Sequence, residues 1–130
     1  MPLKTGRFQP VDRLRRSVEF QQVIRSGRRV AGAAFVVVCS QQRAHPDTAR
    51  QANRLGITVS RKVGNAVVRN HVKRRIREWF RASRGPLGPG VDLVVIGRKA
   101  SAKLPQTPFF AELSLLSSAA VRGARQAGAQ

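Results

Sequence analysis

The sequence predicts an α/β (α+β) sandwich, a small sheet packed by helices, with elements in the order α-β-β-α-β-α. Two segments, residues 33–40 and 90–99, are apolar enough to be buried strands. A third segment, residues 54–63, alternates apolar and polar side chains, which is typical of a strand with one buried face. The segments around these three show helical periodicity instead.

A helix is expected over residues 13–26. Its apolar side chains recur at helical spacing, and Gly27 follows them as a typical helix stop. Residues 1–12, which precede this helix, are expected to form a loose basic N-terminus. The apolar residues of the helix are Leu14, Val18, Phe20, Val23 and Ile24.

Two strands are expected to follow. Residues 33–40, AAFVVVCS, are apolar almost throughout and indicate a buried strand. Residues 41–53 are polar without a period and indicate a loop. In RLGITVSRKV, residues 54–63, leucine, isoleucine and valine alternate with polar residues, so this strand has one apolar and one polar face.

A helix and a further strand are expected next. Asn65 is well placed as the N-cap of a helix that runs to about Ser83. The glycines and prolines of residues 84–90 indicate a turn-rich loop. Residues 90–99 carry apolar side chains on both faces, which is typical of a central strand. The two strands that flank the helix would form a βαβ unit if they lie parallel.

The last helix is expected to begin at Thr107-Pro108, because proline is common at the first helical position. Its tail, residues 123–130, is expected to be frayed. No internal repeat is present, so residues 1–130 are expected to form a single domain. The core stripe of the last helix comprises Phe109, Leu113, Leu116 and Ala120.

Positive charge dominates the composition. The chain carries 25 Lys and Arg against 6 Asp and Glu, a formal net charge of +19. Such a field attracts polyanions, and each neutralised phosphate releases counterions, so nucleic acid is the expected partner. Charge alone does not distinguish RNA from DNA or from an anionic membrane, and it leaves open a basic protein with no polyanion partner.

Cysteine usage and hydropathy indicate a reducing, cytoplasmic setting. Cys39 is the single cysteine and lies in an apolar run, so we expect a small buried side chain and no internal disulfide. The first residues lack the apolar core of a signal peptide. No stretch approaches the roughly 18 apolar residues of a membrane span, so no membrane partner is expected.

The segment RNHVKRRIREWFR, residues 69–81, gives the predicted helix two unlike faces. An apolar stripe covers about one third of the circumference and would pack on the sheet, which offsets the mutual repulsion of the charges. The opposite arc is basic, whereas arcs that face only solvent usually mix both signs, so nucleic-acid contact is favoured. Arginine predominates there, which suits bidentate binding of phosphate. The stripe comprises Val68, Val72, Ile76, Trp79 and Phe80; the basic arc comprises Asn70, Lys73, Arg74, Arg77 and Arg81, with Arg69 at its edge.

The segment GITVSRKVGNAVVRNHVKRRIREWFR, residues 56–81, closely resembles the signature of the bacterial ribonuclease P protein family. RLRRSVEFQQVIRSGRR, residues 13–29, looks like the first helix of that family, and DLVVIGRKA, residues 92–100, looks like its later strand. The resemblance covers roughly residues 13–122. It implies an α/β sandwich with a left-handed βαβ crossover, an exception to the usual right-handed rule.

The resemblance also implies a function. Proteins of this family bind a large catalytic RNA, and that RNA, with Mg²⁺ held mainly by the RNA, removes the 5′ leader from precursor tRNA. The expected partners are therefore the ribonuclease P catalytic RNA and precursor tRNA, and no protein side chain is expected to be catalytic or to hold a metal.

Site residues are implied position by position. Matching the R-N-x-x-K-R-x-x-R pattern, Arg69, Asn70, Lys73, Arg74 and Arg77 would contact the catalytic RNA, and the basic arc adds Arg81. Matching the central cleft of the family, which holds the single-stranded leader, are Phe20, Ser60, Lys62 and Asn65. Ile24 and Val38 stand where some members carry aromatic residues that would stack on leader bases, so leader binding here would depend more on Phe20 and on charge.

Three other functions remain open from the residues. A structural RNA-binding protein of the ribosomal type fits the composition equally well, and non-specific DNA compaction needs no defined helix face. A ribonuclease that pairs two histidines would have to use His45 and His71. His45 lies in a polar loop and His71 lies among arginines, and neither is a well-positioned base.

Overall fold

The computed structural model describes residues 17–42, 53–87 and 90–128. The predicted helices and strands are present there, together with elements that the sequence did not predict. In chain order the elements are α1 (Ser17–Ser26), β1 (Arg28–Ala31), β2 (Phe35–Gln41), β3 (Arg54–Val59), the 3-10 helix η3 (Arg61–Val63), α2 (Ala66–Leu87), β4 (Val91–Gly97), the 3-10 helix η4 (Lys99–Lys103) and α3 (Gln106–Gly128).

The four described strands form one sheet in the order β1-β2-β4-β3. β2 pairs antiparallel with β1 and with β4, whereas β3 and β4 are parallel neighbours, with Leu55 opposite Leu93. Helix α2 connects β3 to β4, so the expected βαβ unit is confirmed. β4 has a strand on each side, which explains why its side chains are apolar on both faces.

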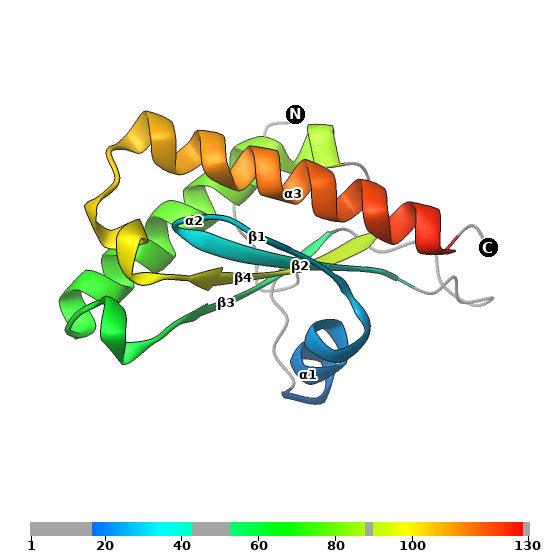
Figure 1. The fold of residues 1–130 in the computed structure, drawn as a ribbon, viewed down its shortest axis with the longest axis horizontal. Helices are drawn as coiled ribbons and strands as arrows, with labels where there is room; N and C mark the ends of the chain where they lie inside the picture. The colour runs from blue at the N-terminus through cyan, green and yellow to red at the C-terminus, as the bar shows by residue number, and fades with distance from the viewer. Residues whose placement is uncertain (1–16, 43–52, 88–89, 129–130) are drawn as a thin grey trace, which may run out of the picture.

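The helices cover both faces of the sheet (Figure 1). Helices α2 and α3 lie on one face, where Phe35, Val37 and Cys39 of β2 join the main core. Helix α1 lies on the opposite face, where Val36 and Val38 of the same strand join a smaller cluster. Successive side chains of a strand point to opposite faces, so the apolar run in β2 serves both layers. The expected α/β sandwich is confirmed.

Several elements differ from the sequence prediction. The strand expected over residues 54–63 ends at Val59, and Arg61–Val63 form η3 instead. β1 was not predicted, because its four residues RRVA are mostly exposed and it pairs with β2 alone. Helix α2 continues to Leu87, so the loop expected from residue 84 begins later. Leu87 is buried in the main core, and its carbonyl oxygen accepts a hydrogen bond from Arg125 Nη2 at 3.1 Å. This contact holds the last turn of α2 despite its glycine and proline.

The frayed tail expected from Gly123 is also wrong for the described residues. Helix α3 continues to Gly128, because its apolar stripe extends past Ala120 to Val121 and Ala124, which are buried against the sheet. The predicted stripe Phe109, Leu113, Leu116 and Ala120 is confirmed as buried. Pro108 is the third residue of the helix, which begins at Gln106.

Two carboxylates that look like surface charges in the sequence hold elements together instead. Glu112 of α3 accepts hydrogen bonds from the backbone N–H groups of Ala34 and Phe35, at 2.7 and 3.0 Å, and so fixes the start of β2. Glu19 of α1 pairs with Arg54 of β3 at 2.8 Å. Arg54 also binds both carboxylate oxygens of Asp92 on β4, so one guanidinium joins α1 to two strands.

Candidate nucleic-acid interface

The junction between β3 and α2 positions the start of the basic helix. Ser60 is the N-cap of η3, and Val63 N–H donates to its carbonyl oxygen at 3.0 Å. Asn65 Oδ1 accepts a hydrogen bond from Val68 N–H at 3.0 Å, which confirms the predicted N-cap of α2. Arg69 Nε donates to the carbonyl oxygen of Gly64 at 3.2 Å, so the first arginine of the helix is oriented by the turn before it.

The predicted apolar stripe anchors α2 against the sheet. Val72, Ile76 and Phe80 are fully buried, Trp79 nearly so, and Val68 is half-buried at the first turn. Trp79 Nε1 also donates to Ser114 Oγ of α3 at 2.9 Å, which satisfies its one polar atom. Each buried side chain contributes roughly 1.5–3 kcal/mol, and the stripe thereby offsets the repulsion among the like charges on α2.

The basic arc points away from this core. Asn70, Arg74 and Arg81 are exposed, while Arg69, Lys73 and Arg77 are half-buried. One carboxylate, Glu78, lies on α2, and it is half-buried. The arc is therefore a dense row of cationic groups on a rigid rod, which suits the regular phosphates of a nucleic acid.

One arginine of α2 does not belong to the arc. Arg75 is 8 % exposed, its guanidinium lies 3.9 Å from the ring centre of Phe109, and its Nη2 donates to the carbonyl oxygen of Leu104 at 2.8 Å. Burial lowers the pKa of Arg75, and the charge of Glu78 acts in the opposite sense. Arg75 therefore joins α2 to η4 and α3 and serves the fold. Sequence spacing did not reveal this, since its partners lie 29 or more residues away.

The residues predicted for leader binding lie at two places. Ser60, Lys62 and Asn65 are exposed together at the junction of β3 and α2. Phe20 is half-buried on α1, in the cluster with Val23, Val94 and Ile96 on the opposite face of the sheet from α2. Ile96 is the register partner of Thr58, and both are half-buried. The sheet surface thus connects Phe20 to the polar end of β3.

The two residues that replace stacking aromatics differ in exposure. Val38 is fully buried in the α1 cluster, so it offers no surface to a ligand. Ile24 is half-buried at the edge of the same cluster.

The described residues also bear on the alternative chemistries. His71 is exposed on α2, and His45 lies outside the described residues. Within residues 17–42, 53–87 and 90–128, no group of three or more His, Cys, Asp or Glu side chains is arranged to hold a metal ion. No helix in this part of the chain is long and apolar enough to cross a membrane.

Comparison with known proteins places this architecture in a family. The family model described as Ribonuclease P matches residues 8–120. The chain belongs to the ribonuclease P protein family. The ribonuclease P protein component of Syntrophobacter fumaroxidans is 40% identical over 111 residues, which cover 84% of this chain and 87% of that protein. The corresponding protein of Exiguobacterium sibiricum is 40% identical over 94 residues, covering 71% and 75% of the two chains.

Solved structures of the family have the same fold. The ribonuclease P protein of Thermotoga maritima is similar with a TM-score of 0.70 and 32% identity, over 82% of this chain and 94% of that one. The protein of Staphylococcus aureus, solved at 2.0 Å, is similar with a TM-score of 0.69 and 31% identity, over 81% and 91% of the two chains. Family membership and fold class, both expected from the signature in residues 56–81, are therefore confirmed.

Proposed function

We propose that this chain is the protein subunit of ribonuclease P, the ribonucleoprotein that removes the 5′ leader of precursor tRNA, and that its basic arc binds the catalytic RNA. One observation carries the assignment of the arc. The opposite stripe of α2 is buried in the core, so the helix is held rigidly with its cations directed outward. Membership of the ribonuclease P family supports RNA as the polyanion over DNA.

In this proposal the leader lies on the surface that runs from the junction of β3 and α2 to α1. Lys62 would neutralise leader phosphates, while Ser60 and Asn65 offer polar groups beside it. Phe20 is the one aromatic residue among the four leader candidates, and base stacking on an aromatic contributes roughly 1–3 kcal/mol. The contacts are sequence-tolerant, which suits leaders of differing sequence.

The protein contributes binding and orientation, and the RNA carries out the cleavage. The Mg²⁺ would be held mainly by the RNA and would supply water activation and charge stabilisation at the leaving oxygen. The chain brings 19 net positive charges to a substrate and a catalyst that repel each other. Neutralising phosphates on both lowers the cation concentration needed to assemble them. We place this assembly in the cytoplasm.

The test is cleavage of precursor tRNA by a bacterial ribonuclease P RNA at low Mg²⁺, with and without the purified chain. Addition of the chain should restore cleavage, and failure with the cognate RNA would refute the proposed function. The triple variant Arg69→Gln/Lys73→Gln/Arg77→Gln should weaken RNA binding and reduce the salt slope by about one unit or less per lost contact. A control for loss of charge outside the arc removes two exposed lysines at η4, Lys99→Gln/Lys103→Gln.

A further inference from the structure

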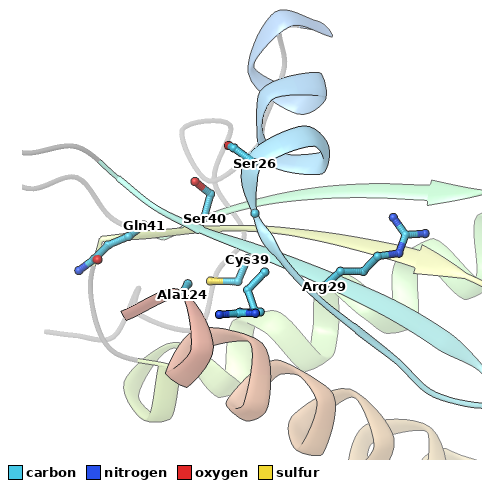
Figure 2. A pocket seen from close by; sticks show the side chains of 8 residues that line it. Ser26, Arg29, Cys39, Ser40, Gln41 and Ala124 are labelled. Atoms are coloured by element: carbon cyan, nitrogen blue, oxygen red, sulfur yellow. The ribbon is translucent and has the colours of Figure 1, made fainter. Parts of the chain in front are cut away.

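A cavity of about 600 Å³ lies at the edge of the sheet remote from the basic arc. It is formed where α1 ends, where β1 begins and where β2 meets the last turns of α3 (Figure 2). Its volume falls in the range of about 300–1,000 Å³ that is typical of ligand sites. The cavity is lined by Ser26, Gly27, Arg28, Arg29, Cys39, Ser40, Gln41 and Ala124.

We propose that this cavity is a second RNA-backbone site, which holds a phosphate and its ribose from an RNA segment other than the one on the basic arc. The proposal rests on the proposed function, since it takes RNA as the partner. β1 and β3 are the two edges of the sheet, separated by three strand spacings of about 4.8 Å each, or roughly 14 Å. The cavity at the β1 edge therefore lies across the sheet from β3, the strand that leads into α2 and its basic arc.

Two arginines give the site its charge. Arg28 and Arg29 are consecutive on β1, so their side chains leave the strand on opposite faces. In Figure 2, Arg29 points away from Cys39 and Ala124, along the sheet. Both are exposed, and within the described residues neither has a carboxylate partner. A backbone that follows the strand edge meets one guanidinium from each side.

The position of Arg28 is set by close packing. A β-carbon placed on Gly123 would lie 2.7 Å from Arg28 Cγ and 2.9 Å from its Nε, so the side chain lies directly on the bare backbone of α3. Arg125, two residues further along α3, donates to the carbonyl oxygen of Leu87 and also exerts its charge on Cys39. Positive charge thus reaches the cavity from α3 as well as from β1.

No negative charge in the described residues neutralises the cavity directly. The carboxylate of Asp92 is near enough to act on Cys39, but Arg54 and Gln42 already donate hydrogen bonds to it. Cys39 itself is neutral, because burial raises the pKa of its thiol to about 12. Its sulfur forms part of an inert floor, so binding is non-covalent.

The remaining lining residues indicate the part of a nucleic acid that is recognised. None of the eight is aromatic, so the cavity offers no platform for a base and reads no sequence. The hydroxyls of Ser26 and Ser40 and the amide of Gln41 can exchange hydrogen bonds with a ribose 2′-hydroxyl, which is absent from DNA. Ser26 Oγ donates to the carbonyl oxygen of Gln22 at 2.7 Å and keeps its lone pairs as acceptors.

Arginines on an edge strand also have a simpler use, since charge there prevents pairing with the edge of another sheet. The two uses respond differently to charge reversal. Arg28→Glu/Arg29→Glu keeps the strand edge charged, so it preserves protection against self-association, whereas a phosphate site is lost.

The test measures binding of the full chain to catalytic RNA and, separately, to precursor tRNA, as a function of salt. Arg28→Gln/Arg29→Gln should reduce the salt slope for one of these RNAs by roughly one to two units, and Arg28→Glu/Arg29→Glu should reduce it at least as much. The control Lys99→Gln/Lys103→Gln removes two positive charges at the other end of the sheet. For the same RNA, its salt slope should be steeper than that of Arg28→Gln/Arg29→Gln. Thermal unfolding of each variant establishes that it is folded.

The location is tested by a cleavage probe, iron–EDTA tethered at Gln41→Cys. Cys39 is buried and neutral, so the introduced thiol is the one that reacts. RNA strands cut from this position should differ from those cut by the same probe at Arg81→Cys on α2. The RNA that carries the cuts identifies the source of the phosphate, catalytic RNA or precursor tRNA.

The outcomes separate this inference from the proposed function. If the unaltered chain fails to restore cleavage at low Mg²⁺, the proposed function fails. If it restores cleavage while both arginine variants retain the control's salt slope, the second site alone is refuted. Identical cleavage patterns from the two tethers would likewise overturn the claim that two RNA segments are bound.

Discussion

Replacing Arg54 with methionine should destabilise the protein more than any other loss of a single surface-accessible charge. The change keeps the aliphatic stem but removes the guanidinium that joins α1, β3 and β4. Asp92, whose side chain is 10% exposed, would lose a bidentate partner and keep the hydrogen bond from Gln42. Removing one member of a buried pair costs about 3–5 kcal/mol, and we expect the lower end, about 3 kcal/mol.

The comparison with Glu19→Gln makes this argument specific. Glu19 binds the same guanidinium at the same distance of 2.8 Å, but its side chain is 35% exposed. An exposed pair contributes about 0.2–1 kcal/mol, so Glu19→Gln should cost several times less than Arg54→Met. The double variant Arg54→Met/Asp92→Leu should recover part of the loss, since the buried carboxylate that loses the guanidinium is removed as well.

Urea unfolding followed by the fluorescence of Trp79 provides the assay. Trp79 is the only tryptophan and is 2% exposed, so its emission reports directly on the core. A loss of about 3 kcal/mol would lower the midpoint without changing the slope with denaturant. If Arg54→Met costs less than about 1 kcal/mol, or no more than Glu19→Gln, burial does not govern the energy of this network and the reasoning is refuted.

Three further predictions concern other contacts. Asn65→Ala should cost about 1 kcal/mol by leaving Val68 N–H without its cap, and Asn65→Asp should restore most of it in thermal unfolding. Gly27→Ala should lower the melting temperature strongly, because the new β-carbon would lie 2.5 Å from the carbonyl oxygen of Val23. The thiol of Cys39, whose pKa is raised from 9.0 to about 12, favours the unfolded state once the unfolded thiol ionises. The free energy of unfolding should therefore fall above pH 9 by up to about 1.4 kcal/mol per pH unit, relative to that of Cys39→Ala. The same pH dependence of unfolding in both proteins would contradict this.

Local pattern was sufficient for the parts of the fold whose signals lie within one element. The stripe of α2 and the run in β2 have the expected period, and the structure buries both. The N-cap at Asn65 depends on a neighbour three residues away, so it too was predictable. The contacts of the basic arc and of Phe20 with RNA remain predictions, because they involve a second molecule.

The features that were missed depend on partners outside the element itself. β1 exists because β2 offers it a partner, although its own sequence is short and charged. Arg75 lies outside the predicted arc, but its contacts with Phe109 and Leu104 could not be predicted from the sequence pattern. In the sequence, Glu112 has the position of a surface charge on a helix. In the structure it accepts a hydrogen bond from the backbone N–H of Ala34, 78 positions away. The partners of Arg75 and Glu112 lie outside any short window of the sequence, whereas β1 and β2 are consecutive strands.

The place of β4 between β2 and β3 has a consequence for synthesis on the ribosome. β4 is made after both of its neighbours, so each presents an unpaired edge until residues 91–97 have left the exit tunnel. Helix α2 is complete before then, but the sheet beneath its apolar stripe is not. We therefore expect folding to follow release of the second half of the chain. A chain stopped before β4 would be an unfolded polycation that binds nearby RNA without specificity. The cations of its basic arc would not be held in a fixed arrangement on the sheet.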